Sequence, residues 1–231
     1  MATRPIYIAQ TNSKINFVTI KEVDFKWFPG MAISQKQKSI ADLHKAAESI
    51  GISIDKILEI SSKSKQPLGV ALSAFNLCLL LPQFKKRISV ECLFQGSKVF
   101  ELGGPFIDLY DKSSRDAKTD DRLKNSGNLL HFSFTNTIWK LNKKTAFYDW
   151  LYLTGLYQNR ELSDLLLNYD ACTDIEFNPK KSMNCQAYSA ALYISLSRNG
   201  LIKSALTSPE NFCEIMSTHT NEVDQVQGKL F

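Results

Sequence analysis

A strand-rich start followed by a helical segment is the feature that most restricts the fold of this chain. The strings RPIYIA and KINFVTIKEVDFKWF are rich in β-branched and aromatic residues and end at Pro29-Gly30, which predicts strands over most of the first 30 residues. The string SQKQKSIADLHKAAESIGI then predicts a helix with Ser34 as its N-cap and Gly51 at its end. The apolar residues of this helix that share a face are Ile40, Leu43 and Ala47.

The later segments continue the mixture of strands and helices. We expect a solvated helix or loop over the charged residues 111–128 and a strand pair or extended segment over 129–141. A long aromatic helix is predicted over 144–169, broken near Gly155. ACTDIEFNP, from residue 171, alternates as a strand does, and CQAYSAALYISLSRNG is predicted to be the last helix, ended by Gly200.

These segments predict a single α+β domain, mostly helical around a small sheet, with a strand-rich N-terminal extension. We find neither an internal repeat nor a dividing linker in residues 1–231. The expected parts are an extension over residues 1–70, a core carrying the chemistry over 71–210, and a polar, flexible tail over 217–231.

The amino-acid composition excludes few classes of function. The hydrophobic fraction of 44% and charged fraction of 22% are ordinary, and the net charge of +5 is compatible with a polyanionic partner without indicating one. The five scattered cysteines predict reduced, buried thiols, and neither they nor the three histidines have the spacing of a zinc site. No signal peptide or bilayer-spanning run is present, so we expect a cytoplasmic protein without a membrane partner.

The run SVECLFQGSKVFELGG, residues 89–104, contains a polar stripe between apolar shoulders. On a helix Glu91, Gln95 and Lys98 lie on one line, at spacings of four and three. This stripe is either a partly exposed helix face with weak charge pairs or the wall of a cleft. In a cleft, a carboxylate and an amine could perform acid–base or Schiff-base chemistry.

Three further patterns also have two interpretations. Asp174, Glu176 and Asn178 alternate on one strand face, which is either solvated or a second acidic wall. Gly103-Gly104 could let a phosphate approach the backbone, although it matches no nucleotide-binding fingerprint. The aromatic residues suit a packed core, or else the stacking of a base; they are Trp27, Phe28, Trp139, Tyr148 and Trp150.

The run around Glu91 resembles the signature of the NADAR family, in which a segment like SVEH-x-x-Q-x-x-K follows a short element ending in asparagine. Here that element is LSAFNL, which places Asn76 at the matching position. The later family blocks correspond to Asp149-Trp150, to Glu176 on an acidic strand, and to Asn184 before the last helix. Cys92 stands where many members have histidine, so a role for that imidazole does not transfer to this chain.

Longer strings resemble the NADAR branch that accompanies DarT toxins. They are GMAISQKQKSI, KTAFYDWLYL and YDACTDIEFNPKKSMNCQA, and the likeness extends over roughly residues 5–210. The resemblance implies a hydrolase that removes ADP-ribose from guanine bases of DNA and so reverses a DarT toxin, as an antitoxin or a phage counter-defence. Its partners would be ADP-ribosylated DNA and, if one is encoded nearby, a cognate DarT toxin. We expect no cofactor or metal, because the sequence contains neither a ligand cluster nor a familiar motif for one.

The juxtaposition of Lys98 and Glu91 suits this chemistry and leads to a hypothesis for the roles of individual residues. Lys98 would attack ribose C1 and form a Schiff base, Glu91 would move the proton, and Glu176 or Asp149 would be a second acid or a ribose anchor. Trp27 or Trp150 would stack a base. Other substrate-binding candidates are Asn76, Gln95, Gly103, Gly104, Asn178 and Asn184, with Lys36, Lys38, Lys180 and Lys181 as either phosphate contacts or solvated lysines.

Other functions stay open at this point. Some NADAR-like proteins resemble N-glycosidases that act on phosphorylated riboflavin-pathway intermediates. A non-enzymatic antitoxin would instead bind and occlude the toxin or its DNA. A two-carboxylate hydrolysis is the alternative to the Schiff base. A generic DNA-binding module is the weakest alternative, because the sequence contains no nucleic-acid fold signature.

Overall fold

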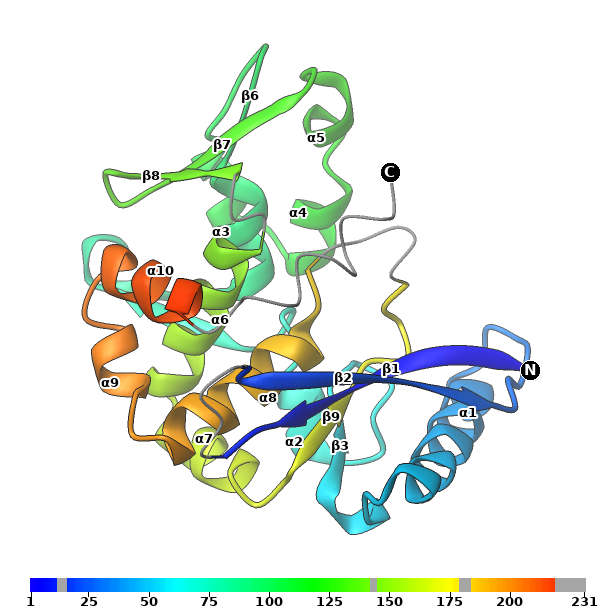
Figure 1. Ribbon diagram of the computed structural model, residues 1–231. Helices are drawn as coiled ribbons and strands as arrows, with labels where there is room; N and C mark the ends of the chain where they lie inside the picture. Colours follow the sequence, from blue (N-terminus) through cyan, green and yellow to red (C-terminus); the bar gives the residue numbers. More distant parts are fainter. Residues whose placement is uncertain (12–15, 142–144, 179–183, 219–231) are drawn as a thin grey trace. The chain divides into compact units, whose positions relative to one another are not determined.

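The computed structural model describes residues 1–11, 16–141, 145–178 and 184–218. Their helices and short sheets confirm the predicted α+β class (Figure 1). The chain divides into two compact units. The first unit comprises Met1–Ser73 together with the part of the chain from Arg160 onward, and the second unit comprises Ala74–Asn159. No helix within the described residues is long and apolar enough to cross a membrane.

The first unit is built on a four-stranded sheet. Its strands are β1 (Ala2–Ala9), β2 (Val18–Phe25), β3 (Ile57–Glu59) and β9 (Ala171–Thr173), in the order β2-β1-β9-β3. β1 pairs antiparallel with β2 over its whole length and with β9 on its other edge, whereas β3 and β9 are parallel. The predicted N-terminal strands are therefore confirmed, and they form half of this sheet.

Helices pack on this sheet through the alternation of its side chains. Ile6 of β1 joins the buried cluster that includes Ile40 and Leu43 of helix α1 (Ile33–Ala46). Its neighbour Tyr7 points to the other face and meets Tyr188 of α8 (Gln186–Arg198) edge to face, with ring centroids 5.8 Å apart. Adjacent residues of one strand thus contact different helices.

Shorter elements complete the first unit. They are η1 (Ala47–Ile50), η2 (Ile54–Lys56), α2 (Pro67–Ala71), α7 (Arg160–Leu166), α9 (Ile202–Ala205) and α10 (Pro209–Thr218). Gly51, at φ +82°, follows η1 as predicted. Two sequence predictions were wrong: α1 has Ala32 as its N-cap rather than Ser34, and α8 is not the last helix, because Gly200 is followed by α9 and α10.

The second unit contains two short sheets and several helices. Hairpin β4 (Cys78–Leu81)–β5 (Lys86–Ser89) leads into α3 (Val90–Gly96), and β6 (Lys98–Phe100), β7 (Leu129–Phe134) and β8 (Thr137–Lys140) form the other sheet in that order. The strand pair expected over residues 129–141 is confirmed. The remaining elements are η3 (Pro82–Phe84), η4 (Ile107–Asp111), α4 (Ser114–Thr119), α5 (Arg122–Asn125) and α6 (Ala146–Gln158).

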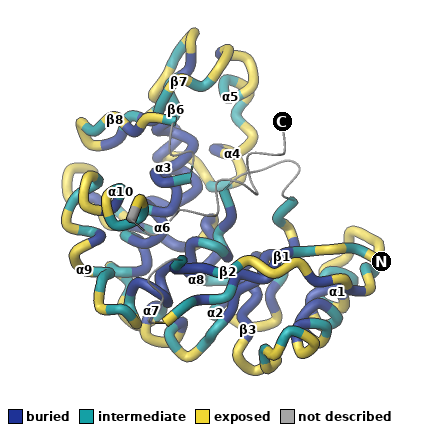
Figure 2. Tube along the Cα trace, viewed as in Figure 1, coloured by how far each residue is buried: buried dark blue, intermediate teal, exposed yellow. Residues whose placement is uncertain are grey.

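The second unit has an aromatic core around Phe147 of α6. Its ring centroid lies 4.8 Å from that of Phe132 and 5.4 Å from that of Trp139, and Phe94 of α3 lies 5.2 Å from Phe132. All seven residues of α3 are buried (Figure 2). For Trp139 and Tyr148, both buried, the packing interpretation is therefore correct.

The predicted break in the long helix at Gly155 was wrong. A Cβ at Gly155 would lie 3.1 Å from Leu79 and 3.2 Å from Leu77, so glycine lets the intact helix α6 approach β4. The interruption comes at Asn159, whose side-chain amide donates to the carbonyls of Gly155 and Cys78. These bonds replace the continuation of the helix into α7.

Gly69→Ala is expected to destabilise the first unit. A Cβ at Gly69 would lie 1.9 Å from the Glu59 carbonyl oxygen and 2.5 Å from Ser64 Oγ, so the backbone must shift. We expect a loss of about 1–3 kcal/mol in the free energy of unfolding, measured by urea denaturation. The control is Ala71→Gly in the same helix, with an expected loss of about 1 kcal/mol at most; equal losses would contradict the steric argument.

Candidate active site in the second unit

The first turn of α3 is attached to the loop that carries Asn76. The backbone N–H of Val90 donates to the Leu77 carbonyl at 2.9 Å, and that of Glu91 donates to the Ala74 carbonyl at 3.0 Å. Two of the N–H groups that a helix start leaves without an intrahelical acceptor are satisfied in this way. The predicted substrate residue Asn76 and the predicted proton shuttle Glu91 therefore lie on segments that are bonded to each other.

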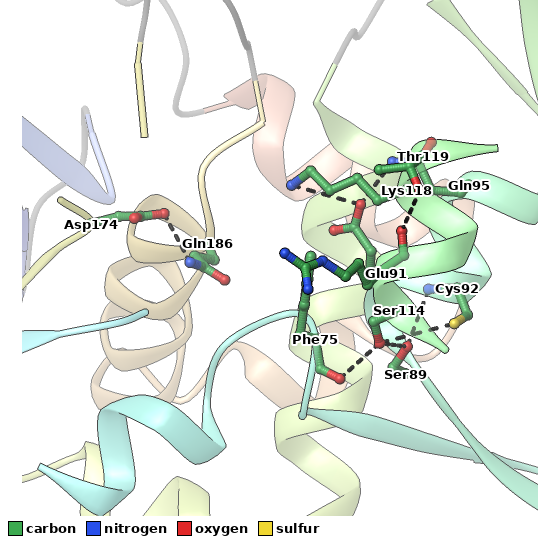
Figure 3. A network of polar contacts seen from close by, with 11 residues as sticks. Phe75, Ser89, Glu91, Cys92, Gln95, Ser114, Lys118, Thr119, Asp174 and Gln186 are labelled. Carbon is green, nitrogen blue, oxygen red and sulfur yellow. Dashed lines mark hydrogen bonds and ion pairs between the residues drawn. The ribbon is translucent and has the colours of Figure 1, made fainter. Parts of the chain in front are cut away.

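A chain of hydroxyl groups fixes the same turn from the side of α4 (Figure 3). Ser89, the N-cap of α3, accepts from the N–H of Cys92, and its Oγ lies 2.8 Å from Ser114 Oγ. Ser114 donates its proton to the Phe75 carbonyl at 2.8 Å, so Ser89 must be the donor to Ser114. Cys92 is buried and donates to the Lys112 carbonyl; the thiol packs structurally where the family often has histidine.

The Glu91 carboxylate is buried, with 5% of the residue exposed, and has two polar neighbours. Gln95 Nε2 donates to Glu91 Oε1 at 2.8 Å, and Lys118 Nζ lies 3.9 Å from the same oxygen. We call Glu91, Gln95, Lys98 and Lys118 the Glu91 cluster. Sequence reasoning missed Lys118 because the alternating charges of residues 111–128 indicated only a solvated segment.

The placement of Lys98 on the helix of Glu91 was wrong. Helix α3 ends at Gly96, and Lys98 begins β6, where it pairs with Phe132 of β7. A Cβ at Gly96 would lie 2.5 Å from the Tyr110 ring, and the hydroxyl of the next residue, Ser97, is bonded to that of Tyr110. This close packing, together with the pairing to β7, directs the chain out of the helix.

Lys98 nevertheless returns to the surface of α3. Its Nζ lies 4.9 Å from the centroid of the Phe94 ring. Burial lowers the pKa of the Lys98 ammonium to about 8; the charge of Glu91 opposes this shift, and the charge of Lys118 adds to it. On the order of a hundredfold more free amine is present at neutral pH than for an ordinary lysine.

Gly104 supports the backbone of Lys98. It has φ +97°, and a Cβ there would lie 2.2 Å from the Lys98 carbonyl oxygen and 3.1 Å from Val99 Cα. At Gly103 the nearest atom to a Cβ would be in the Phe106 ring, at 3.2 Å. The structure thus gives Gly104 a packing role, while the phosphate contact expected of both glycines stays a prediction.

Helix α6 carries the other two candidates of this unit. Asp149 is buried, with 3% of the residue exposed, in the first turn of the helix. Trp150 is half-buried within the aromatic core, with its ring 5.4 Å from Trp139 and 6.1 Å from Phe134. Trp150 therefore already packs against two other rings, and its role in stacking a base stays a prediction.

The remaining candidates lie in the first unit. Lys36 Nζ is 3.2 Å from Glu176 Oε1 and 4.6 Å from the Trp27 ring centroid, and the Arg4 guanidinium lies 5.5 Å from the same ring. The structure thus brings Trp27, Lys36 and Glu176 together. Because two cations already contact Trp27, any base that stacks on this ring must share it with them.

The strand predicted from residue 171 to 178 was wrong beyond Thr173. Asp174 Oδ1 accepts from the N–H groups of Glu176 and Phe177, which turns the chain and ends β9. Asp174 is therefore buried, and its other oxygen accepts from Gln186 of α8, while Glu176 is exposed. Asn178, after the turn, and Asn184, before the α8 N-cap Cys185, are both half-buried.

A buried polar network behind this turn was also missed by sequence reasoning. Glu59 accepts from the Thr173 hydroxyl at 2.7 Å and the Ile175 N–H at 2.9 Å, and His44 Nε2 lies 2.8 Å from Thr173 Oγ1. Burial raises the pKa of both Glu59 and Asp174; the charge of Glu176 adds to the shift of Glu59, and the charge of Glu59 adds to that of Asp174. These bonds fix the segment that presents Glu176.

Some predictions lie outside the described residues: Lys180, Lys181, and the tail except for 217–218. Within the described ranges, no three His, Cys, Asp or Glu side chains gather as metal ligands would. All five cysteines are free thiols; three are buried and Cys78 and Cys213 half-buried.

Comparison with known proteins decides the family. A family model described as the DarT1-associated NADAR antitoxin matches residues 2–226. The chain belongs to this family. Its role is accordingly that of an antitoxin against a DarT toxin, and the resemblance seen in the motifs is confirmed. The search of curated proteins found no match.

Lys98 of this NADAR antitoxin is expected to react with amine-selective acylating reagents at lower pH than its other lysines. Labelling, followed by mass spectrometry of the peptides, should reach half its maximum rate near pH 8, the pKa of Lys98. Because the charge of Glu91 raises this pKa, Glu91→Gln should move the midpoint lower. The exposed Lys124 is the internal control; a Lys98 midpoint equal to that of Lys124 would contradict the burial argument.

Gly104→Ala is expected to disturb Lys98 more than Gly103→Ala does. The added methyl group at 104 meets the Lys98 backbone and forces a strained φ, whereas at 103 it meets the edge of a side chain. We expect a loss of unfolding free energy larger by at least about 1 kcal/mol at 104 and a shifted Lys98 labelling midpoint. Equal effects at the two positions would rule out the packing role.

Proposed function

We propose that this antitoxin hydrolyses the N-glycosidic bond between ADP-ribose and guanine in DNA. The observation that carries the proposal is the Glu91 cluster, in which the charge of a buried carboxylate acts on a lysine with lowered pKa. Perturbed titratable groups gather at catalytic sites more often than elsewhere. Membership in a family of antitoxins against DarT supplies the class of lesion to be removed.

The proposed reaction begins with the ring-opened sugar, in which C1 is doubly bonded to the exocyclic nitrogen of guanine. The free amine of Lys98 adds to C1. One proton of the added amine passes to the guanine nitrogen and Glu91 delivers a second; the C1–N bond then breaks, guanine leaves with its exocyclic amine restored, and a protonated Schiff base remains between C1 and Lys98 Nζ. Water adds to this Schiff base, Lys98 leaves as the amine, and the released ADP-ribose closes its ring.

The environment of Lys98 supports this route. A nucleophilic amine must be unprotonated, and burial holds the pKa of Lys98 near the physiological range. The contacts of Glu91 support a role in proton transfer, because Gln95 donates to its carboxylate and its backbone N–H is bonded to the loop of Asn76. The bond from Gln95 also leaves Glu91 Oε2 available to a substrate.

The other candidates have supporting roles in the proposal. Asn76 lies on the loop bonded to α3, where it would orient the sugar, and Gln95 would contact a ribose hydroxyl. Asp149 or Glu176 would be the second acid or ribose anchor. Trp27 or Trp150 would contact a base, and Gly103, Gly104, Asn178 and Asn184 would contribute backbone or amide contacts to the substrate.

The function is tested by release of ADP-ribose from a guanine-ADP-ribosylated DNA oligonucleotide. We expect release from this substrate and none from the thymine-modified control. Lys98→Ala and Lys98→Met should lose at least about 1,000-fold in kcat, because no other group replaces the covalent step. Lys124→Ala, which removes a lysine from the same unit, should keep the wild-type rate. Borohydride added during turnover should trap ADP-ribose on the peptide containing Lys98.

Two outcomes would overturn parts of the proposal. Near-full activity of Lys98→Ala, or failure to trap an adduct, would exclude the Schiff base and favour hydrolysis by two carboxylates. No release from either DNA by the wild-type protein would exclude the hydrolase. The assay would then turn to phosphorylated riboflavin-pathway intermediates, and to protection of cells by catalytically altered variants.

A further inference from the structure

Lys118 of α4 is held beside the Glu91 carboxylate in a way that a freely solvated lysine is not. Its Nζ lies 3.9 Å from Glu91 Oε1 and 5.1 Å from the centroid of the Phe75 ring. The backbone of Phe75 is held in place, because its carbonyl accepts from Ser114 in the first turn of α4 (Figure 3). The Lys118 side chain still has 56% of its surface in water.

The hydrogen-bonding capacity of Lys118 is largely unused. Its distance to Glu91 is longer than a hydrogen bond, and the structure shows no other polar partner for its ammonium among the described residues. Two cations of the same unit differ in this respect: Arg122 is bonded to Asp108 and Asp120, and Lys86 to Asp111. Lys118 is thus a positioned cation with three donors to offer.

A second polar group in the Glu91 cluster also has spare capacity. Gln95 is buried, with 7% of the residue exposed, and its Nε2 donates to the same Glu91 oxygen that Lys118 approaches. Its Oε1 is buried without a hydrogen-bond partner among the described residues. A buried acceptor of this kind is costly unless a ligand or water donates to it.

We propose that Lys118 is the phosphate-binding residue of the Glu91 cluster and that Gln95 Oε1 accepts a hydroxyl of the attached sugar. The ligand class is a ribose joined to a phosphate or diphosphate. This inference rests on the proposed function, whose substrate carries a diphosphate next to the ribose. Lys118 would leave its long contact with Glu91 for the phosphate, which frees Glu91 for proton transfer.

Binding of ADP-ribose, measured by isothermal titration calorimetry, tests this site without turnover. Lys118→Gln is expected to weaken binding by roughly 10- to 100-fold, the range for one hydrogen bond to a charged group. Lys118→Arg should stay within a few-fold of the wild-type protein, because it keeps the charge. Lys124→Gln on α5 loses the same charge from the same unit and should change affinity less than about twofold at physiological ionic strength.

The opposite results would overturn the site. If Lys118→Gln binds ADP-ribose as tightly as the wild-type protein, or weakens it no more than Lys124→Gln, Lys118 is an ordinary surface lysine. Absence of any binding by the wild-type protein at millimolar ADP-ribose would overturn it as well. Equal urea-unfolding curves for the variants would show that lost affinity does not come from lost folding.

Kinetics separates this inference from the proposed function. With ADP-ribosylated guanine, Lys118→Gln should raise KM far more than it lowers kcat, and this rise in KM should vanish with a guanine–ribose conjugate that lacks phosphates. An equal rise in KM on the conjugate without phosphates would refute phosphate binding. If the wild-type protein releases nothing from guanine yet binds ADP-ribose through Lys118, the hydrolase proposal fails and the phosphate site stands.

Discussion

The attachment of α3 at its first turn is the interaction on which the candidate site depends. The helix places a carboxylate, Glu91, in a buried position, which is costly unless its surroundings are fixed and polar. Backbone bonds from the 74–77 loop and the Ser89–Ser114–Phe75 chain of hydroxyls supply that fixation. The same bonds hold the loop of Asn76 and the start of α4, so one set of contacts positions three parts of the site.

The arrangement around α3 also determines the electrostatic environment of Lys98. Burial favours the neutral amine of Lys98, and the nearby charges of Glu91 and Lys118 act on its pKa in opposite directions. A lysine with a pKa near 8 is partly present as the reactive free amine and can still be protonated. This suits a nucleophile that must also leave ribose C1 at the end of the reaction. In the first unit the buried Glu59 and Asp174 act differently: their hydrogen bonds shape the turn before Glu176.

Residue patterns predicted the elements whose signals are local. The N-terminal strands, the strand pair over 129–141 and the α+β class follow from alternation and turn residues, and the motifs around Glu91 and Asp149 gave the family. Predictions failed where packing overrides the local signal. Gly155 looks like a breaker but lies against Leu77 and Leu79, and the strand after Thr173 ends because Asp174 caps a turn.

The sequence by itself determined the family, and it identified Glu91, Gln95 and Lys98 as a polar group within an apolar run. It did so because these residue types and spacings are written in one short segment. Tertiary structure alone decided that Lys98 reaches α3 from a strand, that Gly104 packs on its backbone, and that Lys118 stands beside Glu91. These contacts are made between segments that are far apart in the chain. The local periodicity of a sequence does not indicate which distant charge will face a buried carboxylate.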